Sequence, residues 1–123
     1  MHFAREDCPG EGLIRAYERG LITVGEQQYV HSLILGPGLA IAPWRPQHAD
    51  DLLHEDFDPV VALRPEILLL GTGSRLNFPA PKLTVRLLQS GIGVEVMDTA
   101  AACRTYNILL AEQRRVVAAL LLD

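Results

Sequence analysis

Three short segments that are typical of strands, separated by two helical patterns, constrain the fold of this chain most strongly. The strand segments are Ile67–Leu70, Val94–Met97 and Val116–Leu122, and the helical patterns cover 79–89 and 99–112. An uninterrupted apolar run such as the first is typical of a strand covered on both faces. The order β-α-β-α-β predicts right-handed crossovers and a largely parallel core sheet, with the orientation of the last strand left open.

Local signals support both helices. Leu83, Leu87 and Leu88 fall on one side of the first helix, and Gly91 is placed to end it. Asp98 stands directly before the second helix and is expected to cap it with its carboxylate.

The N-terminal half is typical of an antiparallel meander. Leu13–Tyr17, Leu21–Val24 and Gln28–Leu35 are rich in β-branched and aromatic residues and are separated by glycine turns, and Leu39–Ala42 adds a further short strand. Together with the second half, this pattern predicts an α/β domain with a mixed sheet, in which the meander precedes β-α-β-α-β.

The remaining segments are connectors. Residues 1–12 carry Pro9, Gly10 and Gly12 and are predicted to form a flexible arm, which leaves 13–123 as a single domain.

Trp44 lies in a proline-bracketed connector, 43–46. A short helix is expected at 48–54 and a second at 58–63, with Asp58 as the N-cap of the second.

Composition excludes several classes of protein. With 49% hydrophobic and 21% charged residues in 123, the chain is expected to form one globular domain. Its longest apolar run has seven residues, Val116–Leu122, whereas a membrane span needs about 20. The formal charge is −4 and the largest basic cluster is Arg114–Arg115, which argues against nucleic-acid binding.

Cysteine usage and the N-terminus indicate a cytoplasmic protein with reduced thiols. Cys8 and Cys103 are far apart and cannot form a tetrahedral zinc site by themselves. The first residues contain no apolar signal region, and Glu6, Asp7 and Glu11 are unlike a mitochondrial presequence.

Two strand ends carry the residues from which a binding site is expected. Ligands gather beyond the carboxyl ends of strands in open α/β sheets, and here two such ends lead into polar segments. The first segment consists of Gly71, Thr72, Gly73, Ser74 and Arg75, and the second of Asp98 and Thr99. Backbone N–H groups, two hydroxyls and an arginine would together hold an anion. The alternative is a tight turn whose glycines serve packing.

No catalytic motif supports a reaction. Glycine-rich nucleotide signatures and the nucleophile elbow around Ser74 are absent, so no catalytic residue is predicted. Asp50, His54 and Asp58 are better explained as a solvated acidic surface than as a metal site, and Cys103 as a packed helix residue than as a nucleophile. We therefore expect no metal and no cofactor.

Two stretches carry a resemblance to a known family. They are Leu68-Leu69-Leu70-Gly71-Thr72-Gly73 and the longer Gly91–Asn107 segment, which reads Gly-Ile-Gly-Val-Glu-Val-Met-Asp-Thr-Ala-Ala-Ala-Cys-Arg-Thr-Tyr-Asn. They resemble the small domain family of unknown biochemical function that includes the mitochondrial respiratory complex I assembly factor 3. The resemblance covers roughly residues 12–123.

This resemblance implies a three-layer α/β fold with a mixed central sheet, and neither catalytic residues nor a cofactor. The eukaryotic relatives act as non-enzymatic assembly factors for the membrane-bound NADH dehydrogenase. The motif positions that carry over are Gly71, Thr72, Gly73, Asp98, Thr99, Tyr106 and Asn107.

The sequence thus favours a non-catalytic, soluble binding or assembly protein with a protein partner, and leaves the oligomeric state open. The alternative is a small-molecule binding protein or an enzyme that uses the cleft between Gly71–Arg75 and Asp98–Thr99 for an anionic ligand. On either reading the two segments, with Tyr106 and Asn107, are expected to form the site.

Overall fold

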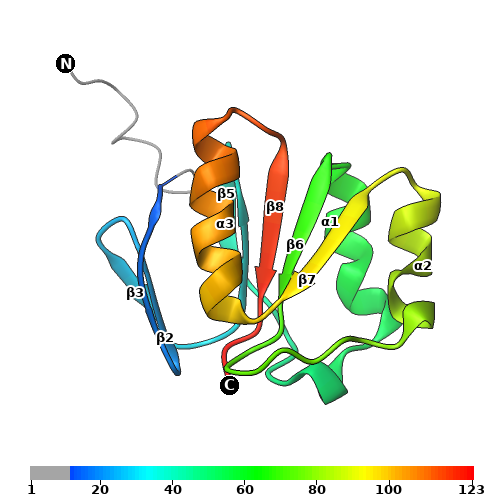
Figure 1. The fold of residues 1–123 in the computed structure, drawn as a ribbon, viewed down its shortest axis with the longest axis horizontal. Helices are drawn as coiled ribbons and strands as arrows, with labels where there is room; N and C mark the ends of the chain where they lie inside the picture. Colours follow the sequence, from blue (N-terminus) through cyan, green and yellow to red (C-terminus); the bar gives the residue numbers. More distant parts are fainter. Residues whose placement is uncertain (1–11) are drawn as a thin grey trace.

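A mixed five-stranded sheet forms the centre of the molecule in the computed structural model, which describes residues 12–123 (Figure 1). The predicted arm therefore lies outside the described residues, except for Gly12. The strand order is β5-β4-β8-β6-β7. The strands are β4 (Leu33–Gly36), β5 (Leu39–Pro43), β6 (Ile67–Gly71), β7 (Gly93–Met97) and β8 (Val116–Leu120).

The three strands predicted in the second half of the sequence are neighbours in this sheet. β6 pairs in parallel with β7 on one side and with β8 on the other, and β8 pairs antiparallel with β4. The predicted β-α-β-α-β order is confirmed, and the last strand runs parallel to the other two. Leu121 and Leu122 continue the buried run beyond the end of β8.

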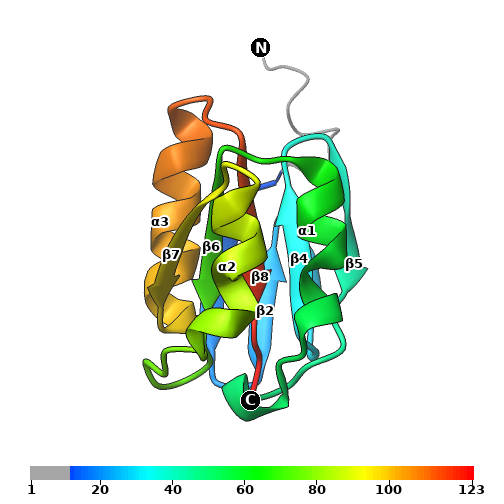
Figure 2. The same ribbon diagram turned by 90° about the vertical axis from the view of Figure 1, so that its right-hand side faces the viewer.

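Helices cover both faces of the sheet and make three layers (Figure 2). α3 (Thr99–Ala111) packs on the face formed by Leu69, Ala118 and Leu120. α1 (Asp58–Leu63) and α2 (Pro81–Gln89) pack on the opposite face, formed by Leu68, Leu70 and Ala119. Successive strand side chains alternate between the faces, so an uninterrupted apolar run supplies both cores.

The meander forms a separate three-stranded sheet rather than an extension of the central one. It consists of β1 (Ile14–Glu18), β2 (Leu21–Val24) and β3 (Gln27–Tyr29), in the order β1-β2-β3. Ile14, Ile22 and Val24 turn their side chains into the same core as α3. The small sheet therefore shares one layer with that helix (Figure 1).

The prediction of one strand over Gln28–Leu35 is wrong, because the chain leaves one sheet and enters the other within it. β3 ends at Tyr29 and β4 begins at Leu33. Ser32, between them, is buried and serves other segments: its hydroxyl oxygen accepts the Leu122 N–H at 2.9 Å, and its carbonyl accepts the Trp44 N–H at 2.9 Å.

Hydrogen bonds to Asp56 hold the connector around Trp44 in place. The Trp44 indole donates to the Asp56 carbonyl at 2.9 Å, and Arg45 donates to both carboxylate oxygens at 2.9 and 2.7 Å. Two 3-10 helices, η3 (Ala49–Asp51) and η4 (His54–Phe57), replace the single helix predicted at 48–54.

The prediction that Asp58 caps α1 is wrong. The helix already includes Asp58, and Phe57 occupies the N-cap position. The Asp58 carboxylate instead accepts a hydrogen bond from the guanidinium of Arg86 on α2, with an N–O distance of 2.5 Å. Pro59 lies in the first turn of α1 as expected, and Arg64, with φ of 50°, ends the helix in the left-handed region.

Candidate functional site

The carboxyl ends of β6 and β7 meet at one edge of the sheet, as the sequence predicted. The Thr72 N–H donates to the Met97 carbonyl at 2.9 Å, and the Thr99 N–H donates to the Gly73 carbonyl at 2.9 Å. The Gly71–Arg75 loop and the start of α3 are thus joined directly to each other by backbone hydrogen bonds.

Thr99 organises this junction from a fully buried position. Its hydroxyl accepts the Gly73 N–H at 2.8 Å and donates to the Leu121 carbonyl at 2.7 Å, which ties β6, α3 and the end of β8 together. A Cβ on Gly71 would stand 2.9 Å from the Thr99 hydroxyl oxygen and 3.0 Å from Leu120. Gly71 is therefore glycine because neighbouring groups fill the space, which favours the packing interpretation at this position.

The loop does hold an anion, and the anion is the chain's own Asp123. The Ser74 N–H lies 3.1 Å from both carboxylate oxygens of Asp123, and the Ser74 hydroxyl lies 3.0 Å from one of them. Gly73 has φ of +99°, and a Cβ there would stand 2.7 Å from the same carboxylate. Burial acts to raise the pKa of Asp123, but the hydrogen bonds from Ser74 bring it below its usual range.

Two further predicted site residues have structural partners. The Asp98 carboxylate accepts the Ala101 N–H at 2.8 Å, which confirms the predicted helix cap. The Thr72 hydroxyl donates to the Arg75 carbonyl at 2.6 Å and accepts the Asn77 N–H at 3.1 Å, which shapes the loop from within.

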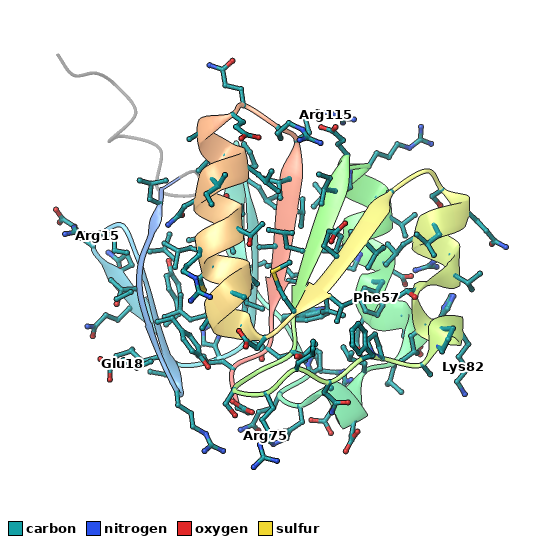
Figure 3. All side chains as sticks on the ribbon, viewed as in Figure 1. Arg15, Glu18, Phe57, Arg75, Lys82 and Arg115 are labelled. Atoms are coloured by element: carbon teal, nitrogen blue, oxygen red, sulfur yellow. The ribbon has the colours of Figure 1, made fainter. Side chains whose placement is uncertain are left out.

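Arg75 differs from the other loop residues because its guanidinium is exposed and makes no hydrogen bond or ion pair with residues 12–123. Figure 3 shows its side chain extending from the lower edge of the molecule. Leu76 and Phe78 follow it along the loop and are 53% and 69% exposed. The loop therefore presents a cation and two apolar side chains to solvent.

Tyr106 and Asn107 lie further along α3 and are not part of this junction. Tyr106 is fully buried between the helix and the sheets. The Asn107 amide donates to the Ile14 carbonyl at 2.8 Å, and its oxygen accepts the Ile14 N–H at 2.9 Å. Asn107 thus pairs with β1 as a neighbouring strand would, and holds the small sheet against α3.

Neither the cysteine nor the acidic segment supports chemistry in the part of the chain that the structure describes. Burial raises the pKa of the Cys103 thiol to about 12, so the nucleophilic thiolate is scarce near neutral pH. Residues 12–123 contain no group of three or more His, Cys, Asp or Glu side chains arranged to hold a metal ion.

Sequence reasoning missed Asp123, which is the partner of the Gly71–Arg75 loop. Asp123 directly follows the buried run Val116–Leu122, so it occupies the same kind of position as Gly71 and Asp98, at the carboxyl end of a strand. This position at a strand end was the sequence signal that could have included Asp123 among the site residues. The pairing of Asp123 with Ser74 joins residues 49 apart in sequence, and no local pattern reveals it.

Comparison with known proteins is consistent with this fold. The family described as "Protein of unknown function (DUF498/DUF598)" matches residues 14–121. The chain belongs to this family. A Bordetella pertussis structure described as a Mth938-like domain has a TM-score of 0.82 and 33% identity to this DUF498/DUF598 chain, covering 100% of this chain and 93% of the other.

Two relatives of this DUF498/DUF598 chain carry different names. "NADH dehydrogenase [ubiquinone] 1 alpha subcomplex assembly factor 3" of Xenopus tropicalis is 39% identical over 67% of this chain and 46% of its own length. The chain thus spans about half of that relative. A "13 kDa major membrane protein" of Francisella tularensis is 28% identical over 94% of this chain and 95% of its own. Among residues 12–123 no helix has the length and apolar character that crossing a membrane requires.

Proposed function

We propose that this protein is a non-catalytic assembly factor that binds a protein partner through the loop Arg75–Phe78. The observation that carries the proposal is the exposure of Arg75, Leu76 and Phe78 on a loop whose base is held rigidly by Gly73, Ser74 and Asp123. A rigid base lowers the ordering cost of binding, and exposed aromatic and arginine side chains are frequent anchors of protein interfaces.

The relatives support a protein partner in general terms. The Xenopus relative is named as an assembly factor, which is a role exercised on other proteins. By this proposal the chain acts in the cytoplasm on the biogenesis of a protein complex. Mass spectrometry of the proteins that it captures identifies the complex.

The alternative, an enzyme or small-molecule site in the same junction, has less support. The Thr99 hydroxyl and the Ser74 N–H and hydroxyl already serve Gly73, Leu121 and Asp123. A free anion would have to displace the Asp123 carboxylate to reach the Ser74 donors. Arg75 is the charged side chain of the Gly71–Arg75 segment, and it forms no ion pair with residues 12–123.

The test compares two conservative arginine variants in native cells. Arg75→Lys keeps the charge but loses the fork that grips a carboxylate with two hydrogen bonds. Arg104→Lys makes the same change on the exposed side of α3. Proteins captured by the wild type are quantified by mass spectrometry, and the melting temperature of each variant is measured alongside.

We expect Arg75→Lys to lose specific partners that Arg104→Lys retains, while all melting temperatures stay close together. A second variant, Phe78→Ser, removes an apolar anchor and should lose the same partners. If both loop variants capture the wild-type set of proteins while remaining folded, this loop is not the binding surface.

A further inference from the structure

β7 leaves one edge of the central sheet unpaired. The strand order places β7 and β5 at the two edges, and β7 pairs only with β6 among the described strands. β5 is protected, since it ends in Pro43 and its pairing with β4 shifts register. β7 contains no proline and pairs with β6 in unbroken register. In Figure 2 it forms the left-hand side of the sheet, with α2 on the near face and α3 on the far face.

The backbone groups of Val94 and Val96 point away from β6. At one end of β7, the Gly93 N–H donates to the carbonyl of the residue before β6 at 3.0 Å. At the other end, the Met97 carbonyl accepts the N–H of the residue after β6 at 2.9 Å. In a parallel ladder alternate residues of a strand bond to the same neighbour. The N–H and C=O groups of Val94 and Val96 therefore lie on the free side of β7, where a further strand could bond to them.

The side chains of β7 are apolar on one face and acidic on the other. Val94 and Val96 are half-buried and pack against the core on the α2 side of the sheet. Glu95 lies opposite Leu69 in the register, so it belongs to the α3 face. It is exposed and makes no hydrogen bond or ion pair with residues 12–123. The free edge thus presents an acidic side chain between two apolar ones.

Both covering helices have open flanks on the side of this edge. On α2, Arg86 binds α1 and Leu87 is buried on the sheet. Successive helix residues are about 100° apart, so Leu88, which is 57% exposed, lies on the flank away from α1. On α3, Thr105 is partly exposed and lies roughly opposite Asn107, which holds β1. An added strand would therefore meet an apolar flank on α2 and a small polar residue on α3.

Glu95 discriminates between the possible occupants of the edge. Antiparallel pairing of two complete β7 strands would place the two Glu95 carboxylates opposite each other, and like charges in that position destabilise a sheet. A lysine or arginine opposite Glu95 is favoured instead, and the formal charge of −4 also favours a basic partner. Val94, Val96 and the exposed Leu88 favour apolar residues on either side of that cation.

We propose that the free edge of β7 binds an extended segment of another protein, in which a lysine or arginine stands between two apolar residues. The segment adds as an antiparallel strand, with its apolar residues opposite Val94 and Val96 and its cation opposite Glu95. Backbone hydrogen bonds supply the affinity, and the alternating side chains supply the specificity. This surface is separate from the Arg75–Phe78 loop, so the inference does not depend on the proposed function.

The probe is the blocked peptide Thr-Val-Lys-Val-Thr, and binding is followed by NMR shifts of the Val94 and Val96 amides. In the proposed register both valine N–H groups of the peptide face β7, whereas its lysine N–H faces away. N-methylation therefore separates backbone pairing from attraction between side chains. We expect saturable shifts with the parent peptide and with the form methylated at lysine, and none with the form methylated at both valines.

Variants of the protein test the charge. Glu95→Gln should weaken binding of the parent peptide about two- to fivefold, as expected for loss of an opposite-charge pair between strands. Glu95→Lys should prefer the peptide Thr-Val-Glu-Val-Thr. Glu26→Gln is the matched control, because it removes an exposed carboxylate from the turn between β2 and β3. Arg75→Gln alters the loop of the proposed function and should bind the peptide as the wild type does, so the two proposals fail separately.

Three results would overturn the proposal. Absence of saturable shifts at Val94 and Val96, or equal binding of the parent and valine-methylated peptides, would leave Glu95 as a charge that only protects the edge from pairing. Shifts of the same amides with rising protein concentration, in the absence of peptide, would show that a second copy of the chain occupies the edge.

Discussion

Asp56 shows how a single carboxylate can organise a connector that has little regular structure. It is 8% exposed, and its two carboxylate oxygens accept hydrogen bonds from two nitrogens of the Arg45 guanidinium. One of these oxygens also accepts the Leu53 N–H at 2.7 Å. The hydrogen bond from Arg45 is the main cause that lowers the pKa of Asp56, and burial opposes it. Charge-assisted bonds of this kind are among the stronger ones in proteins.

Replacing Asp56 with asparagine should therefore lower stability and change its pH dependence. We expect Asp56→Asn to cost about 1–3 kcal/mol near neutral pH. Because the folded pKa is lowered, the stabilisation is present above the unfolded value of about 4 and is lost as pH falls through the folded pKa. Urea denaturation from neutral to acidic pH should therefore show a flatter profile for Asp56→Asn. The exposed Asp50→Asn serves as the control, and a profile matching that control would refute the prediction.

Asp98 allows a direct test of the helix cap. Asp98→Ala should lower the free energy of unfolding by about 0.5–2 kcal/mol, because the Ala101 N–H loses its acceptor. Asp98→Ser retains a capping oxygen and should recover most of that loss in urea denaturation. An equal loss in both variants would mean that the carboxylate acts in another way.

The residues differ in how far sequence could predict them. The Asp98 cap was predictable because cap and helix are adjacent, so a local pattern contains the whole interaction. The Ser74–Asp123 contact was not, because its two partners meet only after the sheet has formed. Similarly, Asp58 resembles an N-cap in sequence, but Arg86 on another helix is its partner in space.

Among the elements, β6 contributes buried side chains to the hydrophobic cores on both faces of the central sheet. Leu68 and Leu70 face α1 and α2, Leu69 faces α3, and all three are fully buried. The periodicity of the second half was sufficient to predict its strands and helices. The strand expected at 28–35 was wrong, since residue propensities do not show where a chain leaves one sheet for another. The helix expected at 48–54 was wrong because contacts around Asp56 divide that segment.

Leu69→Ala should cost about 2–5 kcal/mol, because the substitution leaves a cavity in a fully packed strand. The matched control is Val85→Ala on α2, where the side chain is 43% exposed and much less burial is lost. Guanidinium denaturation of both variants measures the difference. A loss well below 1 kcal/mol for Leu69→Ala would contradict the central place of β6 in the fold.

At the scale of the molecule, the two sheets are covered to different extents, and α3 packs against both of them. The central sheet has helices on one face and α3 with the small sheet on the other, whereas β3 is partly exposed and lies at the edge of its sheet. Asn107 supplies two hydrogen bonds that hold β1 to α3. Segments with few buried contacts open first in native proteins.

Hydrogen exchange should therefore be faster in β1–β3 than in β6 and β8. Asn107→Ala should accelerate the exchange of β1 amides further while leaving those of β6 nearly unchanged, because the lost bonds belong to the small sheet. Asn77→Ala, in the exposed loop, is the control and should leave β1 as it is. Uniform acceleration through both sheets would show instead that they open as one unit.

The position of Asp123 matters for the way such a protein is attached to a support. Its side chain rests on Ser74, directly beside the loop that carries Arg75 and Phe78, at the end of the molecule marked C in Figure 1. An affinity handle fused after residue 123 would emerge at that loop and bring the resin against it. Attachment ahead of β1, which begins at the opposite end in Figure 1, leaves the loop facing the lysate.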